Sequence, residues 1–174
     1  MNDSVILTTA RLRLRAVTLD DAEALFEAFG DVDLMQYWSS AAHADAEQTR
    51  THLETRMTDS PENMTLAVTW AGDDRALGTV SIMPRKPGVF EIGYIFARAA
   101  WGQGVAHESV ACVIDHIFAS MRARRIYADT DPDNSGSIAL LERLGFVREG
   151  YLREEWETHI GVRDTALYGL LKRE

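Results

Sequence analysis

The chain has 174 residues, 46% of them hydrophobic, so we expect residues 1–174 to form one domain with a proper core. The formal net charge of −9 argues against general binding to nucleic acid or to acidic membranes. No apolar run approaches membrane-spanning length, and the single cysteine excludes an internal disulfide. These features predict a cytoplasmic protein.

The first third of the chain predicts one strand and two helices. Leucine alternates with arginine in Thr8–Ala16, as in a half-exposed strand. A capping-box pattern at Thr18–Asp21 begins a helix that Gly30 ends in the usual glycine role at a helix C-terminus. A second helix is predicted over Ala44–Met57, with His43 as a solvated residue at its start.

The middle and the end of the chain predict a sheet. Three closely spaced antiparallel strands are expected, followed by one parallel strand and a C-terminal strand: Met64–Trp70, Ala76–Met83, Phe90–Phe96, Arg125–Thr130 and Thr165–Lys172. The turn between the second and third strands is predicted at Pro84–Gly88. A crossover helix should make the Arg125 strand parallel to the Phe90 strand.

A glycine turn, Trp101–Ala106, separates the Phe90 strand from a helix predicted to run from about Gly104 to Met121. A helix that begins in such a turn directs unpaired N–H groups and a positive dipole end at one spot, which suits a phosphate. The P-loop pattern is absent, and His107 replaces the third glycine of the dinucleotide fingerprint. The alternative is a plain strand-to-helix connection.

A second motif follows the Arg125 strand. The polar turn Asp131–Ser137 leads into a short helix that Gly145 ends, with the spacing N-x-x-S…L-x-x-L-G-F. This motif fixes a polar pair and a helix exit together. The glycine turn and this motif, in this order, make the plain-connection alternative a poor one.

The two motifs resemble those of the GNAT N-acetyltransferases, whose pyrophosphate motif is [QR]-x-x-G-x-[GA]. In this chain the first position of the pattern is Trp101, where the family has Gln or Arg. Together with Glu108 after the motif, Trp101 makes the chain resemble the branch that acetylates ribosomal-protein N-termini. The resemblance implies an α+β three-layer fold with a mixed, mostly antiparallel sheet of about seven strands. It also implies flanking helices, a splayed central strand pair, acetyl-CoA as the acetyl donor and, by family precedent, a homodimer.

The resemblance assigns the cofactor to three segments. The pyrophosphate would meet the turn of Trp101, Gly102, Gln103, Gly104, Val105 and Ala106. The pantetheine arm would meet the backbone of Ile95, Phe96 and Ala97, together with Asn134 and Ser137. Arg143 and Arg98 are candidates for the phosphates of CoA, and Arg143 has the alternative of a surface position on its helix.

Acetyl transfer to an amine requires a base and an acid. The base candidate is Glu91, on the strand that the resemblance places in the cleft, and its alternative is a solvated edge position. Leu141 stands where the family often has a tyrosine acid, so Ser137 is the acid candidate, with a helix N-cap as its alternative. Direct transfer in a ternary complex is expected, because no activated Cys or Ser–His pair appears.

The candidates for acceptor binding are Tyr37, Trp38, Glu91 and Glu155. The alternative for Tyr37 and Trp38 is a position in the core, and the alternative for Glu155 is a solvated position on its strand. No His, Cys or carboxylate cluster has metal-ligand spacing, so no metal is expected. The predicted function is N-acetyl transfer from acetyl-CoA to a primary amine, first a protein N-terminal α-amine. Polyamines, amino acids and antibiotics are alternative acceptors, and a non-catalytic acyl-CoA-binding module is the alternative of another class.

Overall fold

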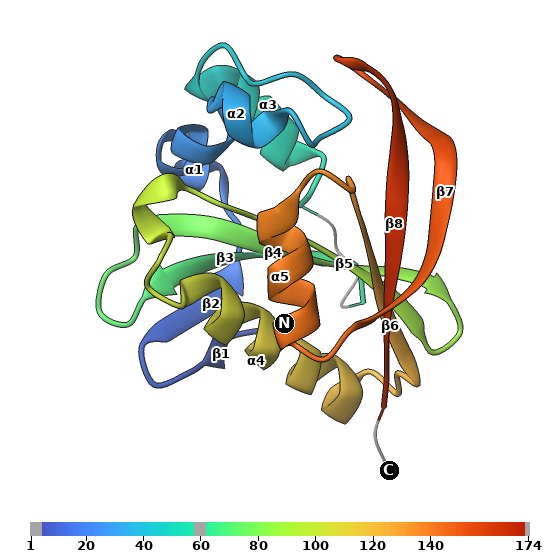
Figure 1. The fold of residues 1–174 in the computed structure, drawn as a ribbon. Helices are drawn as coiled ribbons and strands as arrows, with labels where there is room; N and C mark the ends of the chain where they lie inside the picture. The colour runs from blue at the N-terminus through green and yellow to red at the C-terminus, as the bar shows by residue number, and fades with distance from the viewer. Residues whose placement is uncertain (1–4, 58–61, 173–174) are drawn as a thin grey trace.

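The computed structural model describes residues 5–57 and 62–172 as a mixed sheet with helices on both faces (Figure 1). Eight strands of these residues pair in the order β1-β2-β3-β4-β5-β6-β8-β7. Only β5 and β6 are parallel among them. The strands are β1 Leu7–Thr8, β2 Leu12–Ala16, β3 Met64–Trp70, β4 Ala76–Lys86, β5 Val89–Phe96, β6 Arg125–Thr130, β7 Val147–Thr158 and β8 Gly161–Leu171.

Five α-helices lie in the described residues: α1 Ala22–Phe29, α2 Val32–Met35, α3 Ala46–Glu54, α4 Val105–Ser120 and α5 Ser135–Arg143. The helices α1 to α3 gather on one side of the sheet, and α4 and α5 lie on the other (Figure 1). None of the helices in these residues is long and apolar enough to cross a membrane. The predicted α+β layering and mostly antiparallel sheet are confirmed.

The alternation of side chains along the strands divides the core between the two faces. On β3, Leu66 and Val68 pack with the α4 side, while Ala67 packs with α1 to α3. Helix α4 contributes Val110, Val113 and Ile117, whose spacing forms one face of a helix. Each large apolar side chain so buried stabilises the fold by about 1.5–3 kcal/mol, and this packing holds the two central strands between the helical layers.

The two central strands separate along their length. The two strands pair over three residues each, with Val89–Glu91 of β5 alongside Arg125–Tyr127 of β6. Beyond Glu91, β5 continues in register with β4 as far as Phe96, and β6 continues with β8 as far as Thr130. The backbone edges that face each other past Glu91 are therefore not joined by ladder hydrogen bonds in the described structure. The predicted splay is present, and the gap opens toward the carboxyl ends of both strands.

Three local predictions were wrong. The strand Thr8–Ala16 is divided into β1 and β2, because Thr9 Oγ1 accepts the Leu12 N–H at 2.9 Å and closes a turn there. β4 runs through Pro84 to Lys86, where a register shift marks a bulge that accommodates a proline. β8 begins at Gly161, four residues before the predicted start.

Gly30 also differs from its predicted role. It ends α1, but its φ of −87° is right-handed, so the left-handed conformation of the usual glycine cap is not used. A Cβ at Gly30 would lie 2.6 Å from the Phe26 ring. Glycine is required there by close packing.

Candidate active site

The glycine turn before α4 has the geometry of an anion site. Gly102 and Gly104 have φ values of +70° and +78°, which residues with a Cβ rarely adopt. Gly104 is the N-cap of the 16-residue helix α4, and its carbonyl accepts the Glu108 N–H at 3.0 Å. The N–H groups of the first turn therefore point out of the helix end, toward the mouth of the turn.

A second segment of the chain holds this turn in place. Arg11, beside the β1–β2 turn, donates to the Gln103 carbonyl at 3.0 Å and forms an ion pair with Glu108 at 2.6 Å. Glu108 also accepts the hydroxyl of Thr9 at 2.5 Å. That hydrogen bond, followed by those from Arg11, keeps the pKa of Glu108 below its usual value despite burial. The trailing glutamate of the motif thus ties the turn to the first hairpin.

A cavity of about 620 Å³ lies over the glycine turn, between β5 and α5. Ten of the predicted cofactor residues line it: Ile95, Phe96, Trp101, Gly102, Gly104, Val105, Ala106, Asn134, Ser137 and Arg143. Trp101 is half exposed and its indole N–H donates to the Phe96 carbonyl at 3.0 Å. The structure therefore brings together residues that lie 48 positions apart in the sequence, from Ile95 to Arg143.

Three other predicted cofactor residues have different surroundings. The Ala97 N–H donates to the Leu77 carbonyl at 2.9 Å, and Ala97 does not line the cavity. Gln103 lies outside the lining as well, with its side-chain amide bonded to the Ala99 carbonyl at 2.6 Å. Arg98 forms ion pairs with two aspartates, Asp31 and Asp33. Its charge is thus already compensated within the protein.

The second motif adds a hydroxyl pair at the gap between β5 and β6. The N-cap of α5 is Asn134, whose Oδ1 accepts the Ser137 N–H at 3.1 Å, so the N-cap alternative for Ser137 was wrong. The Ser137 hydroxyl instead lies 2.8 Å from the hydroxyl of Tyr94 on β5. Burial raises the pKa of Tyr94 to about 12, although this hydrogen bond lowers it. Leu141 is fully buried in the core.

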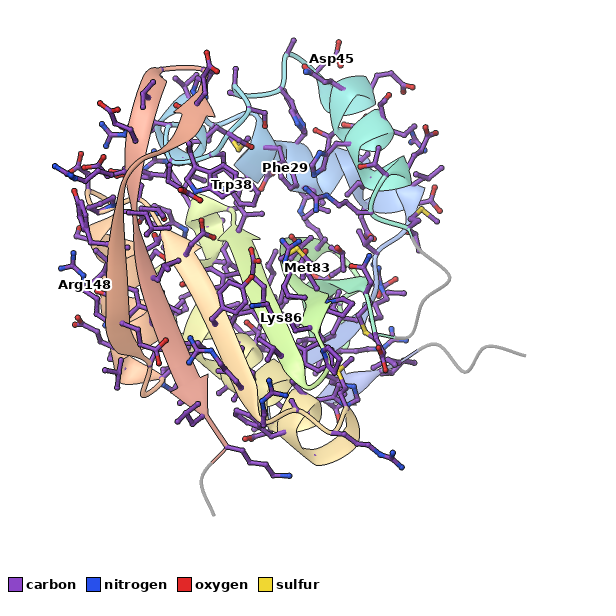
Figure 2. The ribbon with its side chains drawn as sticks, turned by 90° about the vertical axis from the view of Figure 1, so that its right-hand side faces the viewer. Phe29, Trp38, Asp45, Met83, Lys86 and Arg148 are labelled. Atoms are coloured by element: carbon purple, nitrogen blue, oxygen red, sulfur yellow. The ribbon has the colours of Figure 1, made fainter. Side chains whose placement is uncertain are left out.

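A second cavity, of about 360 Å³, lies on the α1–α3 side of the gap. Phe29, Tyr37 and Trp38 form an aromatic wall, with the Phe29 and Trp38 rings 6.1 Å apart. Figure 2 shows the labelled Phe29 and Trp38 side chains near each other, above the part of the sheet where Met83 of β4 is labelled. Trp38 also packs against the core. Trp38 therefore packs against the core and lines the cavity at the same time, so its two predicted alternatives do not exclude each other.

The two cavities meet at the gap. Five residues line both of them: Tyr37, Trp38, Tyr94, Asn134 and Ser137. The passage between the cavities thus runs past the hydroxyl pair, with the glycine turn at one end and the aromatic wall at the other.

Two carboxylates line the second cavity near the gap. Glu91 on β5 is mostly buried and pairs with Arg85, Nε to Oε2, at 2.7 Å. Asp129 on β6 was missed by the sequence analysis. Burial first, and then the charge of Glu91, raise the pKa of Asp129. The only sequence signal was a carboxylate in an otherwise buried strand that the resemblance places beside the gap.

The β7–β8 hairpin closes the side of the second cavity, and in Figure 1 it rises from the sheet toward the level of α2 and α3. The Trp156 indole N–H donates to Asp129 Oδ2 at 2.9 Å, and Arg163 forms an ion pair with Asp131 at 2.8 Å. Glu155 is exposed on β7 and lies outside the lining of both cavities. Its neighbour Trp156, rather than Glu155, faces the cleft.

The prediction of a solvated His43 was wrong. His43 is buried, its Nδ1 lies 2.9 Å from the Thr49 hydroxyl, and its ring stacks on Phe29 at 5.1 Å. His52 also contacts Phe29 and lines the second cavity. Burial, with smaller contributions from Arg56 and His43, lowers the pKa of His52 to about 4. No group of three or more His, Cys, Asp or Glu in the described residues is arranged to hold a metal.

Comparison with known proteins identifies this architecture. The family model described as acetyltransferase (GNAT) domain matches residues 11–147. The uncharacterized N-acetyltransferase p20 of Bacillus licheniformis is 33% identical over 172 residues, which cover 97% of each chain.

Two solved structures from Vibrio share the fold. The ribosomal-protein-S5-alanine acetyltransferase of Vibrio fischeri is 21% identical with a TM-score of 0.80, and the match covers 98% of each chain. The spermidine N-acetyltransferase of Vibrio cholerae, in complex with CoA and spermine, is 22% identical with a TM-score of 0.79, and the match covers 94% of this chain and 96% of that one. The chain therefore belongs to the GNAT family and is an acetyl-CoA-dependent N-acetyltransferase.

Proposed function

We propose that this enzyme acetylates a primary amine by direct transfer in a ternary complex, with a protein or peptide N-terminal α-amine as the first candidate acceptor. The observation that carries the proposal is the meeting of the two cavities at the β5–β6 gap. One cavity has the anion site that a CoA pyrophosphate requires, and the other has carboxylates near an aromatic wall. A donor and an acceptor bound one in each cavity would meet at the hydroxyl pair.

On this proposal the pyrophosphate binds the first turn of α4, and Arg143 compensates phosphate charge. The pantetheine arm would lie in the gap along β5, where its amides pair with the free backbone edge as an added strand would. The roles of Ala97 and Gln103 in cofactor binding are weaker proposals, because their polar groups already have partners within the protein.

The chemistry needs a neutral amine, because only the deprotonated nitrogen attacks. Asp129 or Glu91 would take the ammonium proton, directly or through water. The nitrogen would then attack the thioester carbonyl carbon, and a backbone N–H at the gap would stabilise the oxyanion. As the carbon–sulfur bond breaks, the nitrogen would lose to water the surplus proton that it carries after attack, and the departing thiolate would receive a proton from the Tyr94–Ser137 pair. Asp129 is the stronger base candidate, since Arg85 already holds Glu91.

The acceptor class rests on resemblance. Similarity to the ribosomal-protein branch supports an N-terminal amine as the acceptor. Similarity to the spermidine enzyme supports a polyamine as the alternative acceptor. Tyr37 and Trp38 would contact the acceptor; a role for Glu155 would require a long acceptor that reaches the outer face of β7. A homodimer and a cytoplasmic location complete the proposal.

The test is acetyl-CoA consumption, read as free thiol, with N-terminal peptides, spermidine and free amino acids as acceptors. We expect turnover with one class of amine and, in a parallel calorimetric titration, binding of CoA. CoA binding without turnover on any amine would instead support the acyl-CoA-binding module. Absence of CoA binding would contradict the cofactor site.

A further inference from the structure

Four of the seven charges that line the second cavity, where we propose that the acceptor binds, are compensated in two ion pairs. Its wall carries four carboxylates and three arginines: Glu91, Asp129, Asp131, Asp164, Arg56, Arg85 and Arg163. Arg85 pairs with Glu91, and Arg163 with Asp131. Asp164 accepts the Tyr151 hydroxyl at 2.6 Å and the Glu154 N–H at 2.7 Å, and these bonds hold the β7 bulge.

Three of the charged groups have no ion pair among the described residues: Asp129, Asp164 and Arg56. Asp129 on β6 is bonded at Oδ2 by neutral donors, the Trp156 indole and the Thr165 hydroxyl. Arg56, just after α3, lines the opposite, helical wall and is half-buried. A half-buried guanidinium without a partner is unfavourable, because part of its hydration is lost and nothing replaces it.

The neighbours of Arg56 do not neutralise it. His52 lines the same wall, and burial keeps it uncharged at neutral pH. Arg56 lines this wall too, and its positive charge contributes to the lowered pKa of His52. Within the described residues, the cavity therefore has a positive charge without an ion pair on its α3 side and a negative charge without an ion pair, Asp129, at the gap.

We infer that the acceptor is an amine that also carries a carboxylate, and that Arg56 binds this carboxylate while the amine lies at Asp129. The inference rests on the proposed function and sharpens its acceptor class. The carboxylate can belong to a free amino acid or to an acidic side chain near a peptide N-terminus. A polyamine fits poorly, because two of the four carboxylates are ion-paired with arginine and Arg56 repels it.

The test compares matched acceptors that differ only in the anionic group. Alanine is compared with alaninamide. The C-terminally amidated peptide Ala-Asp-Ala is compared with the equally amidated peptide Ala-Asn-Ala. Arg56→Ala is compared with wild type and with Arg50→Ala, which removes the same charge from α3 outside the cavity lining. We expect Arg56→Ala to raise KM for the acidic member of a pair about tenfold to a hundredfold, as for loss of a charge-assisted hydrogen bond. KM for acetyl-CoA and for the neutral member should change less than twofold.

The pair that shows the effect identifies the source of the carboxylate. Equal KM values for acidic and neutral acceptors in wild type, or an equal effect of Arg56→Ala on both, would overturn the inference while leaving acetyl transfer intact. Faster turnover of spermidine than of every carboxylated amine would also overturn it. Calorimetric binding of each acceptor to the CoA complex provides a readout without turnover, in which the same acidic preference, lost in Arg56→Ala, is expected. Failure of the proposed function alone would leave this binding preference in place.

Discussion

The cavity over the glycine turn, where we propose that the cofactor binds, and the second cavity, where we propose that the acceptor binds, share one gap but are built in different ways. The cofactor side uses two contiguous motifs, the glycine turn with α4 and the Asn134 turn with α5, and its key groups are backbone N–H donors and two hydroxyls. The second cavity is assembled from α1, the segment after α2, α3, the four strands β3 to β6 and the β7–β8 hairpin, and its key groups are charged side chains.

This difference separates a site that is defined by backbone geometry from a site that is defined by charged side chains. Backbone geometry can be fixed by a few glycines and a helix start, so the donor site depends on local sequence. Charged side chains from distant segments can be changed singly without altering the fold. On the proposed function, the pairing of those charges specifies the acceptor, and the predictions below test the two halves separately.

The largest expected effect is on the cofactor half. Gly104→Val should reduce CoA affinity at least a hundredfold, because valine disfavours a φ of +78° and its Cβ would lie 3.3 Å from the Arg11 guanidinium that holds the turn. Calorimetry with CoA measures this. Gly72→Val is the matched control, since Gly72 has a φ of +89° in a turn outside both cavities. Equal CoA binding by wild type and Gly104→Val would remove the phosphate site from the account.

The acceptor half should show its largest loss at Asp129. Asp129→Asn should lower kcat about a hundredfold or more, the usual contribution of a general base, with the CoA affinity unchanged. In wild type, turnover should fall as the pH decreases through the raised pKa of Asp129, because the protonated carboxyl cannot act as a base. Glu91→Gln should have the smaller effect. If Glu91→Gln is the more damaging change, the two assignments must be exchanged.

The hydroxyl pair joins the halves, and its loss should affect turnover only. Tyr94→Phe and Ser137→Ala should each lower kcat about tenfold with little change in CoA affinity, because the thiolate would leave without a proton. The double variant should be no worse than about the poorer single one if the two hydroxyls act as a unit. Stopped-flow release of CoA thiol measures the step. Additive losses would show that the hydroxyls act independently.

The smallest effect concerns the tie between the turn and the first hairpin. The pKa of Glu108 is lowered from 4.5, so its stabilisation of the fold is present above pH 4.5 and is lost as the pH falls through the lower folded value. Glu108→Gln should reduce Tm by about 2–4 °C at pH 7, corresponding to about 1 kcal/mol, and by less at pH 3. The exposed Asp115→Asn on the same helix is the control. A loss that does not depend on pH would exclude the ion pair as its cause.

The elements around the glycine turn and the Asn134 turn could be predicted from the sequence because their signals are local. The start of α4, the parallel β6 and the end of α5 near Gly145 follow from glycine placement and hydrophobic pattern, and all agree with the structure. The errors at Gly30 and His43 have one cause. In both, an aromatic ring from α1 decides the packing, and a pattern of residue types does not reveal which ring meets which backbone.

The acceptor half could not be predicted to the same degree. The roles proposed for these side chains depend on their neighbours in the fold. Tyr94 meets Ser137, 43 positions away, and Asp129 meets Trp156, 27 positions away. Arg56 acts on His52, 4 positions away, across the wall of the cavity. Glu155 and Trp156 are adjacent in the sequence, yet only Trp156 faces the cleft. Register shifts between Leu152 and Trp156 set which of them does so, and the sequence gives no direct sign of those shifts.

A structure of the enzyme with acetyl-CoA bound would test the central claim most directly. The account predicts the pyrophosphate at the N–H groups of the first turn of α4, the pantetheine arm in the β5–β6 gap, and the thioester sulfur within hydrogen-bonding reach of the Tyr94 or Ser137 hydroxyl. A cofactor bound outside the gap, or a thioester far from both hydroxyls and from Asp129, would contradict it.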